Sequence, residues 1–144
     1  MAKARVGMSA AEITLFWERE FPQVYQDGRV IEVVAAGDGR ATLRMEPAPR
    51  LLRPGGTISG PAMFTLADLA MYAAVLSAIG PVALAVTTNL NINFLRRPAP
   101  SPMLAHARII KLGSRLAVGD VEMLSEGESE MAAHATSTYS IPPH

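Results

Sequence analysis

A single acidic residue stands inside a long apolar stretch of this sequence. Residues 60–79 contain only one charged side chain, Asp68, near the middle. Removing a carboxylate from water is costly unless the group is paired, hydrogen-bonded or protonated. A carboxylate held in such surroundings can act as a general base or a nucleophile near neutral pH. The structural alternative is an Asp68 that faces solvent or a satisfied polar pocket.

The start of the same stretch carries a second chemical feature. We expect a helix to begin at Ser59-Gly60-Pro61, with Gly60 as its N-cap and Pro61 in its first turn. Unpaired backbone N–H groups and the positive end of the helix dipole meet at such a terminus. The terminus could polarise a carbonyl group or stabilise an oxyanion, although any helix start offers this much.

The spacing of these two features limits how they can cooperate. Gly60 and Asp68 are eight positions apart, so along one helix they stand roughly 12 Å apart. That separation is too large for both to act on one carbonyl group. If Gly60 holds the carbonyl oxygen and Asp68 handles the attacking water, the two must come from neighbouring subunits related by a two-fold axis. The hypothesis therefore predicts a dimer.

The segment that carries both features reads as a buried helix. Gly80-Pro81 is a natural stop after residue 79. A helix that is apolar all round is either buried in its own protein or spans a membrane, and Asp68 at the centre of a bilayer would cost about 3 kcal/mol. We therefore expect a core helix that the protein covers on every side.

The chain before this helix predicts a short helix and a hairpin. Ser9 and Glu12 have capping-box spacing, and apolar residues follow at helical period before Pro22: Ile13, Phe16, Trp17 and Phe21. Residues 29–36 and 40–46 are β-rich and flank Gly37-Asp38-Gly39, which predicts an antiparallel hairpin. Residues 47–56 are rich in Pro and Gly and predict a loop.

The chain after the helix is β-rich to its end. Leu90, Ile92 and Phe94 alternate with three asparagines, as in a strand with two different faces. Turns at Gly113-Ser114 and Glu126-Gly127 indicate tight connections. The expected strands are residues 82–96, 103–111, 115–124 and 129–141, joined as a four-strand meander.

These elements together predict an α+β architecture. The chain has 144 residues, of which 49% are apolar, enough for one core, so we expect a single domain over residues 1–144. A curved antiparallel sheet wrapped around one long helix is the hotdog fold, and the order helix, hairpin, buried helix and meander agrees with it.

Composition excludes several functions. Thirteen basic and thirteen acidic residues give no net charge, which disfavours nucleic-acid binding. The absence of Cys excludes disulfides, thiolate zinc sites and a cysteine nucleophile, and the three dispersed His residues give no metal-ligand spacing. The amphipathic N-terminal segment is no apolar signal core, so we expect a cytoplasmic protein with no membrane partner.

Three runs of the sequence resemble a known family. They are residues 56–68 (GTISGPAMFTLAD), residues 86–96 (VTTNLNINFLR) and residues 127–139. In these runs the chain resembles the phenylacetic-acid-degradation type of hotdog acyl-CoA thioesterases, over nearly all of its length after about residue 30. The resemblance implies hydrolysis of an acyl-CoA thioester to a free acid and coenzyme A. Coenzyme A is then part of the substrate, and no separate cofactor is expected.

The resemblance also implies roles for individual residues. Asp68 becomes the catalytic carboxylate, which activates water or attacks the thioester itself, and the Gly60 N–H of the other subunit becomes the oxyanion donor. Thr87 falls where such enzymes place a hydroxyl that positions the water, with Thr88 in its place if the alignment shifts by one. The remaining candidate contacts for the substrate and coenzyme A are Arg53, Gly56, Pro61, Thr88, Asn89, Arg96, Arg97, Lys111 and Arg115.

Three positions depart from the family pattern. The family has His just before the oxyanion glycine and Asn earlier in the loop, where this chain has Ser59 and Arg53. Ser59 can still donate a hydrogen bond and Arg53 could contact coenzyme A, so both join the candidate site. Pro61 replaces a second glycine and removes one N–H, which makes Gly60 the more important donor.

We therefore predict a homodimer, or a dimer of dimers forming a homotetramer, that hydrolyses acyl-CoA. The alternatives are a non-catalytic acyl-CoA-binding module and a structural or partner-binding dimer. A hotdog dehydratase is disfavoured because His106, His134 and His144 lie far from the helix start in the sequence. The acyl group is left open, since four residues could line its pocket or belong to the core: Met63, Phe64, Met71 and Tyr72.

Overall fold

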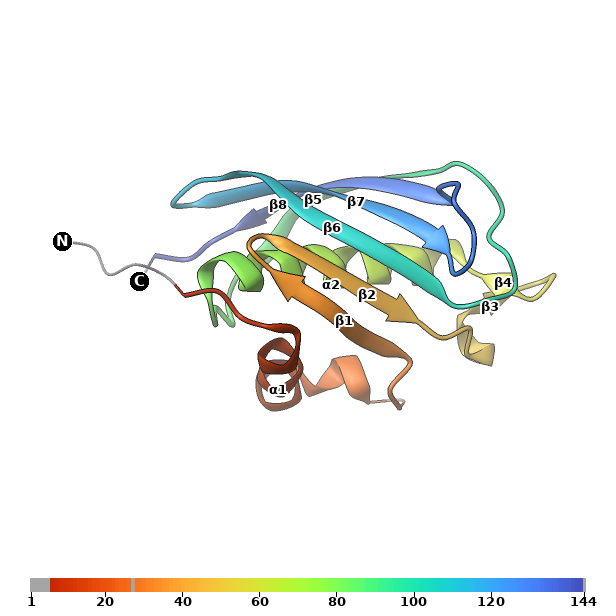
Figure 1. The fold of residues 1–144 in the computed structure, drawn as a ribbon, viewed down its shortest axis with the longest axis horizontal. Helices are drawn as coiled ribbons and strands as arrows, with labels where there is room; N and C mark the ends of the chain where they lie inside the picture. The colour runs from red at the N-terminus through yellow and green to blue at the C-terminus, as the bar shows by residue number, and fades with distance from the viewer. Residues whose placement is uncertain (1–5, 27, 144) are drawn as a thin grey trace.

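The computed structural model describes residues 6–26 and 28–143, in which a curved antiparallel sheet wraps one long helix (Figure 1). A second helix packs at the open side of the sheet. This is the predicted hotdog fold. The elements are α1 (Ala10–Glu20), η1 (Pro22–Tyr25), β1 (Ile31–Gly37), β2 (Arg40–Met45), η2 (Pro49–Leu51), β3 (Leu52–Arg53), β4 (Thr57–Ile58), α2 (Gly60–Ile79), β5 (Val86–Phe94), β6 (Met103–Leu112), β7 (Leu116–Ser125) and β8 (Ala133–Ser140).

The six-stranded sheet has the order β1-β2-β6-β7-β8-β5, and all its pairs are antiparallel. The predicted hairpin β1–β2 and the turns β6–β7 and β7–β8 are confirmed. The predicted four-strand meander is wrong, because β5 pairs with β8 at the edge of the sheet instead of with β6. The link between β5 and β6 contains Pro98, Pro100 and Pro102, which suit a long crossing connection better than a tight turn.

Two strands start later than predicted. Residues 82–85 form a turn in which the Ala85 N–H donates to the Val82 carbonyl. The Tyr72 hydroxyl of α2 reaches the Val82 and Ala83 carbonyls at 3.2 and 3.4 Å, which holds this turn against the helix. Residues 129–132 also lie outside β8, which begins at Ala133. The predicted loop at 47–56 contains regular structure, namely η2 and β3, and β3 pairs with β4 just after the loop.

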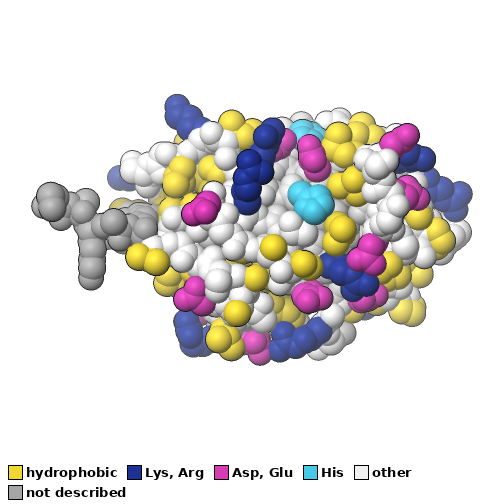
Figure 2. Space-filling view, in the orientation of Figure 1, with side chains coloured by type: hydrophobic (Ala, Val, Ile, Leu, Met, Phe, Trp, Pro, Cys, Tyr) yellow, Lys and Arg dark blue, Asp and Glu magenta, His cyan; other side chains and the backbone are white. Residues whose placement is uncertain are grey.

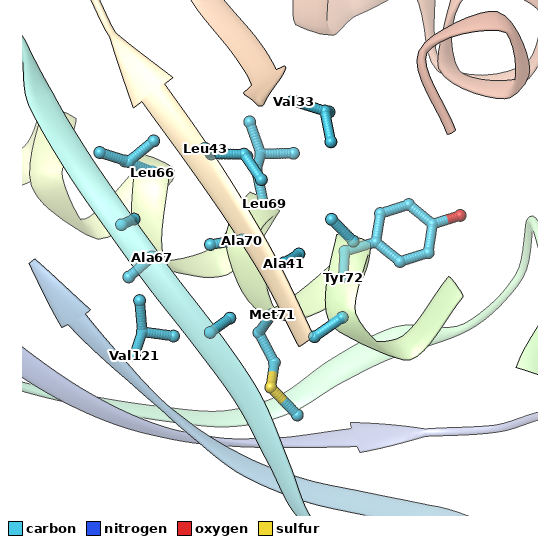
Figure 3. Packing of buried hydrophobic residues seen from close by; sticks show 14 of the residues in the cluster. Val33, Ala41, Leu43, Leu66, Ala67, Leu69, Ala70, Met71, Tyr72 and Val121 are labelled. Carbon is cyan, nitrogen blue, oxygen red and sulfur yellow. The ribbon is translucent and has the colours of Figure 1, made fainter. Parts of the chain in front are cut away.

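Packing explains the apolar composition of α2. By length and composition alone this helix could cross a membrane, but 78% of its apolar window is buried inside the fold. Its residues pack against Val33, Ala41 and Leu43 of the first hairpin and against Val121 of β7 (Figure 3). One hydrophobic core thus forms between α2, the sheet and α1.

The covering of α2 is not complete, contrary to expectation. Its second half is buried except at the half-buried Ala78, whereas Pro61, Phe64 and Thr65 of its first half are exposed. The sheet ends at β5 on one side of this half, and α1 packs on the second half through Trp17 and Tyr72. One stripe of the N-terminal half of α2, next to Asp68, therefore remains open.

Candidate active site

The Asp68 carboxylate sits half-buried in α2 and is held by two hydroxyl groups. Thr87 Oγ1 donates to Asp68 Oδ1 at 2.5 Å, and the Tyr139 hydroxyl lies 3.0 Å from the same oxygen. Within the described part of the chain, no group donates to Asp68 Oδ2. One oxygen of the carboxylate is thus fixed by the protein, and the other keeps its lone pairs for a ligand or a water molecule.

A β-bulge in β5 directs Thr87 to this carboxylate. Leu90 and Ile92 pack on the core, so strict alternation would turn Thr88 inward and Thr87 outward. The register shifts between Thr87 and Asn89, which leaves Thr88 as the extra residue. Such a bulge re-aims the side chains that precede it. Thr87 therefore points inward to Asp68, while Thr88 Oγ1 donates to the Thr138 carbonyl at 3.2 Å.

Tyr139 has no role that the sequence pattern predicts. This residue pairs with Thr87 across the β5–β8 ladder, so two neighbouring hydroxyls meet one carboxylate oxygen. Burial, together with the charge of Asp68, raises the pKa of Tyr139 well above its ordinary value, so the hydroxyl keeps its proton. The only signal in the sequence was its inward position in a strand of small residues, because no local pattern relates Tyr139 to a residue 71 positions earlier.

The start of α2 presents one free backbone donor. Ser59, not Gly60, is the N-cap, because Ser59 Oγ accepts from the Ala62 N–H at 3.3 Å. The Met63 N–H donates to the Ser59 carbonyl, and Pro61 has no N–H. Among residues 6–26 and 28–143, nothing accepts a hydrogen bond from the Gly60 N–H. The first turn therefore leaves Gly60 as its one unpaired donor, as an oxyanion site requires.

Gly60 and Asp68 open into two different cavities of the same chain. The Gly60 cavity measures about 810 Å³ and includes Met63 and Phe94 in its walls. The Asp68 cavity measures about 420 Å³ and lies between α2, η1 and the first hairpin, with Phe64 in its wall. The two cavities share no residue, so a single chain does not bring the carboxylate and the free N–H to one point.

Three of the candidate arginines line the Gly60 cavity. Arg53, Arg96 and Arg97 line it together with Pro61. Arg96 forms an ion pair with Glu130, whereas no acidic partner for Arg53 or Arg97 occurs in the part of the chain that the structure describes. The opening that these arginines line, the mouth of the Gly60 cavity, is therefore positively charged. A positive charge there suits an anionic ligand.

The Arg97 side chain crosses the turn between β3 and β4. A Cβ atom at Gly55, whose φ is +103°, would lie 2.0 Å from a terminal nitrogen of Arg97. Gly56 closes the same turn by donating its N–H to the Arg53 carbonyl. Gly56 thus shapes the turn and does not line the cavity.

Other predicted contacts lie elsewhere. Asn89 is exposed and Thr88 is bound to β8, and neither lines one of the two cavities. Lys111 and Arg115 lie at the β6–β7 hairpin, at the same end of the sheet as Thr87 but separated from β5 by β7 and β8. Gly60 contacts the ring of Phe94, at the other end of β5. One chain therefore separates these cations from the Gly60 cavity.

The remaining candidate residues lie in the cavity walls, in the core or on the outer face of the sheet. Met63 lines the Gly60 cavity and Phe64 the Asp68 cavity, whereas Met71 and Tyr72 are buried in the core. His106 and His134 lie on the outer face of the sheet, and His144 is outside the described residues. No group of three or more metal-ligating side chains occurs among the described residues.

Comparison with known proteins agrees with this fold. The family model of the thioesterase superfamily matches residues 55–132. A candidate thioesterase from Silicibacter sp. is 42% identical, with a TM-score of 0.84 over 98% of this chain and 95% of that chain. A candidate esterase of Saccharolobus solfataricus is 32% identical over 111 residues, 77% of this chain and 73% of that protein.

A further solved structure specifies the type. A variant of the phenylacetic acid degradation protein PaaI from Thermus thermophilus is 28% identical, with a TM-score of 0.67 over 78% of this chain and 93% of that chain. The chain therefore belongs to the thioesterase superfamily, within the phenylacetic-acid-degradation type of hotdog-fold thioesterases. Its class of reaction is the hydrolysis of a thioester.

Proposed function

We propose that this protein hydrolyses acyl-CoA thioesters by attack of a water molecule that Asp68 activates. The observation that carries the proposal is the carboxylate itself, with Oδ1 held by Thr87 and Tyr139 and Oδ2 free. A base must offer an accessible lone pair in a fixed direction, and this geometry provides one. The basic mouth at Gly60 supports coenzyme A as the thiol part of the substrate, because its phosphates are anionic.

The reaction runs in two steps, addition of water and collapse of the intermediate. Water attacks the thioester carbon, a C–O bond forms, and the water proton passes to Asp68 Oδ2 as negative charge develops on the carbonyl oxygen. The Gly60 N–H stabilises that oxyanion. When the intermediate collapses, the C–S bond breaks and the coenzyme A sulfur takes the proton back from Asp68. Thr87 donates to Oδ1 and can still accept a hydrogen bond from the attacking water.

The catalytic site is shared between two subunits in this proposal. Gly60 and Asp68 stand roughly 12 Å apart along one helix and open into separate cavities. The edge strand β5 and the open stripe of α2 expose apolar side chains, with Phe64 44% and Phe94 52% exposed. An antiparallel pair of α2 helices would cover this surface and place Gly60 of one chain near Asp68 of the other.

Several lesser assignments complete the proposal. Arg53, Arg96 and Arg97 bind phosphates of coenzyme A, and Lys111 with Arg115 reach the substrate held at the partner's mouth. Ser59 caps α2 and offers its hydroxyl proton beside Gly60. The reaction needs no cofactor or metal, and we place it in the cytoplasm.

Release of free thiol from a panel of acyl-CoA substrates tests the function. The panel holds short aliphatic, long aliphatic and aryl thioesters. We expect turnover by the native protein and a loss in kcat on the order of a hundredfold or more in Asp68→Asn, which keeps the shape and removes the base.

The matched control is Asp38→Asn, the same substitution in the exposed β1–β2 turn. Asp38 has a φ of 52°, a conformation that Asn also tolerates, so this variant should keep native turnover. If no acyl-CoA is hydrolysed, or if Asp68→Asn is as active as the native protein, the proposed mechanism is wrong. Ligand-dependent stabilisation without turnover would then favour an acyl-CoA-binding module.

A further inference from the structure

Tyr139 contacts Asp68 of α2 from strand β8, on the inner face of the sheet. Its hydroxyl lies 3.0 Å from Asp68 Oδ1 and 3.1 Å from the Asp68 backbone carbonyl. The two acceptors belong to one residue, so the hydroxyl contacts both the helix backbone and the carboxylate that the helix carries. A single donor, Thr87, would leave the carboxylate free to pivot about one hydrogen bond. A second donor on the same oxygen fixes its plane.

A stack of three buried rings holds Tyr139 in place. The Tyr139 ring stacks on Tyr72 with centroids 5.7 Å apart and planes at 12°. Tyr72 of α2, labelled in Figure 3, stacks in turn on Trp17 of α1, again at 5.7 Å. The Trp17 ring is fully buried and the other two are almost so. Close packing in a stack of this kind leaves a buried ring little rotational freedom.

We propose that Tyr139 is a positioning residue for the reaction. Its hydroxyl, fixed by the Tyr72 and Trp17 rings, holds Asp68 Oδ1 so that Oδ2 faces the substrate. The helix α1 thereby supports the base although it contributes no atom to it. This inference rests on the proposed function of Asp68, but the position of the carboxylate can be measured without turnover.

Kinetics of Tyr139→Phe give the first test, because this change keeps the ring stack and removes the hydroxyl. We expect kcat to fall about tenfold or more with KM within about twofold, since misplacing a base affects the chemical step rather than binding. The control is Ser137→Ala, on the same strand and the same face. The buried Ser137 Oγ donates to the Asn89 carbonyl at 3.1 Å and does not contact Asp68.

Ser137→Ala should lower the melting temperature to a similar extent and leave kcat within about twofold of native. The inference is overturned if Tyr139→Phe loses no more kcat than Ser137→Ala, or if KM rises in proportion. A fall in kcat that accompanies only a fall in the folded fraction would also overturn it.

Crystal structures of the two variants give the second test, which needs no activity. In Tyr139→Phe the Asp68 carboxylate should rotate or take a second conformation, and in Ser137→Ala it should stay. An unmoved carboxylate in Tyr139→Phe overturns the inference even if turnover falls. If the native protein hydrolyses no thioester, the proposed function fails, and the crystal structures still decide whether Tyr139 positions Asp68.

A measurement on native side chains covers the case in which Tyr139→Phe does not fold. The Tyr139 hydroxyl proton should appear in the NMR spectrum as a resonance protected from exchange with water. Its frequency should change in Asp68→Asn, where a neutral acceptor replaces the charged one. A hydroxyl proton that exchanges freely, or that is insensitive to Asp68→Asn, overturns the inference.

Discussion

Thr87 and Thr88 are adjacent and chemically identical, yet only one of them contacts the Asp68 carboxylate. Thr87 Oγ1 donates to Asp68 Oδ1 at 2.5 Å, and Thr88 Oγ1 donates to a backbone carbonyl of β8. The bulge at Thr88 causes the difference. A hydrogen bond to a charged group is worth more than one between neutral groups. The two residues should therefore contribute very unequally to catalysis.

Paired valine substitutions test this inequality. Thr87→Val keeps the side-chain shape and removes the hydroxyl, and we expect kcat to fall about tenfold or more, which corresponds to about 1.4 kcal/mol. Thr88→Val should stay within about twofold of native in the same thiol-release assay. Equal losses in both variants, or a larger loss in Thr88→Val, would show that the bulge does not place Thr87 as described.

At the scale of elements, an ionic bridge joins three strands on the outer face of the sheet. Asp120 of β7 accepts from Arg108 of β6 at 2.8 Å and lies 2.9 Å from His134 Nε2 of β8. Figure 2 shows acidic, basic and histidine side chains on this face. Burial would raise the pKa of Asp120, but the hydrogen bonds from Arg108 and His134 and their charges outweigh it and lower the pKa below 3.8.

A lowered pKa predicts how the bridge depends on pH. A carboxylate of this kind stabilises the fold above its unfolded pKa, and the contribution is lost as the pH falls through its folded pKa. Asp120→Asn should lower the free energy of unfolding at about pH 7 by roughly 1–3 kcal/mol. Urea unfolding should show this difference shrinking toward about pH 3. A difference that stays constant over that range would mean that the Asp120 charge does not stabilise the sheet.

At the scale of the molecule, each chain holds two halves of a site that do not meet. The Gly60 half contributes a free N–H and an arginine-lined mouth, and the Asp68 half contributes the carboxylate and the second cavity. Two identical chains related by a two-fold axis would form two complete sites, each with one half from either chain. This arrangement predicts that two different inactive variants restore one another.

Complementation between Asp68→Asn and Gly60→Pro tests the shared site. Proline at the first helical position removes the N–H, and the extended Ser59 before it is compatible with proline. A heterodimer purified through two different tags should regain roughly half of native turnover, because one of its two sites has both halves intact. Each variant alone should be nearly inactive.

The control for the proline variant is Gly60→Ala, which keeps the N–H. Its Cβ would meet Phe94 Cζ at 3.4 Å, as a proline Cβ would, so both variants crowd the same ring. Gly60→Ala should keep most of native turnover, and loss of activity in both variants would point to crowding instead of a missing donor. A heterodimer without activity would place the whole site within one chain.

Much of the fold could be predicted because its signals are local. Ser9 and Glu12 form the expected capping box three residues apart, and Gly39 takes the positive φ that its hairpin turn requires. The apolar composition of residues 60–79 predicted a buried helix without any knowledge of its neighbours. Asp68, Gly60 and Thr87 also followed from the sequence, since an isolated charge, a helix start and a family pattern can each be read along one stretch of chain.

The tertiary structure alone decided the contacts between distant segments. The pairing of β5 with β8, the bulge that selects Thr87 over Thr88, and the hydrogen bond from Tyr139 to Asp68 join residues 39 to 71 positions apart. The open stripe of α2 likewise depends on where the sheet ends, which residues 60–79 do not specify. Local sequence sets the conformation that each segment prefers, whereas the neighbours of each segment depend on how all of them pack into one core.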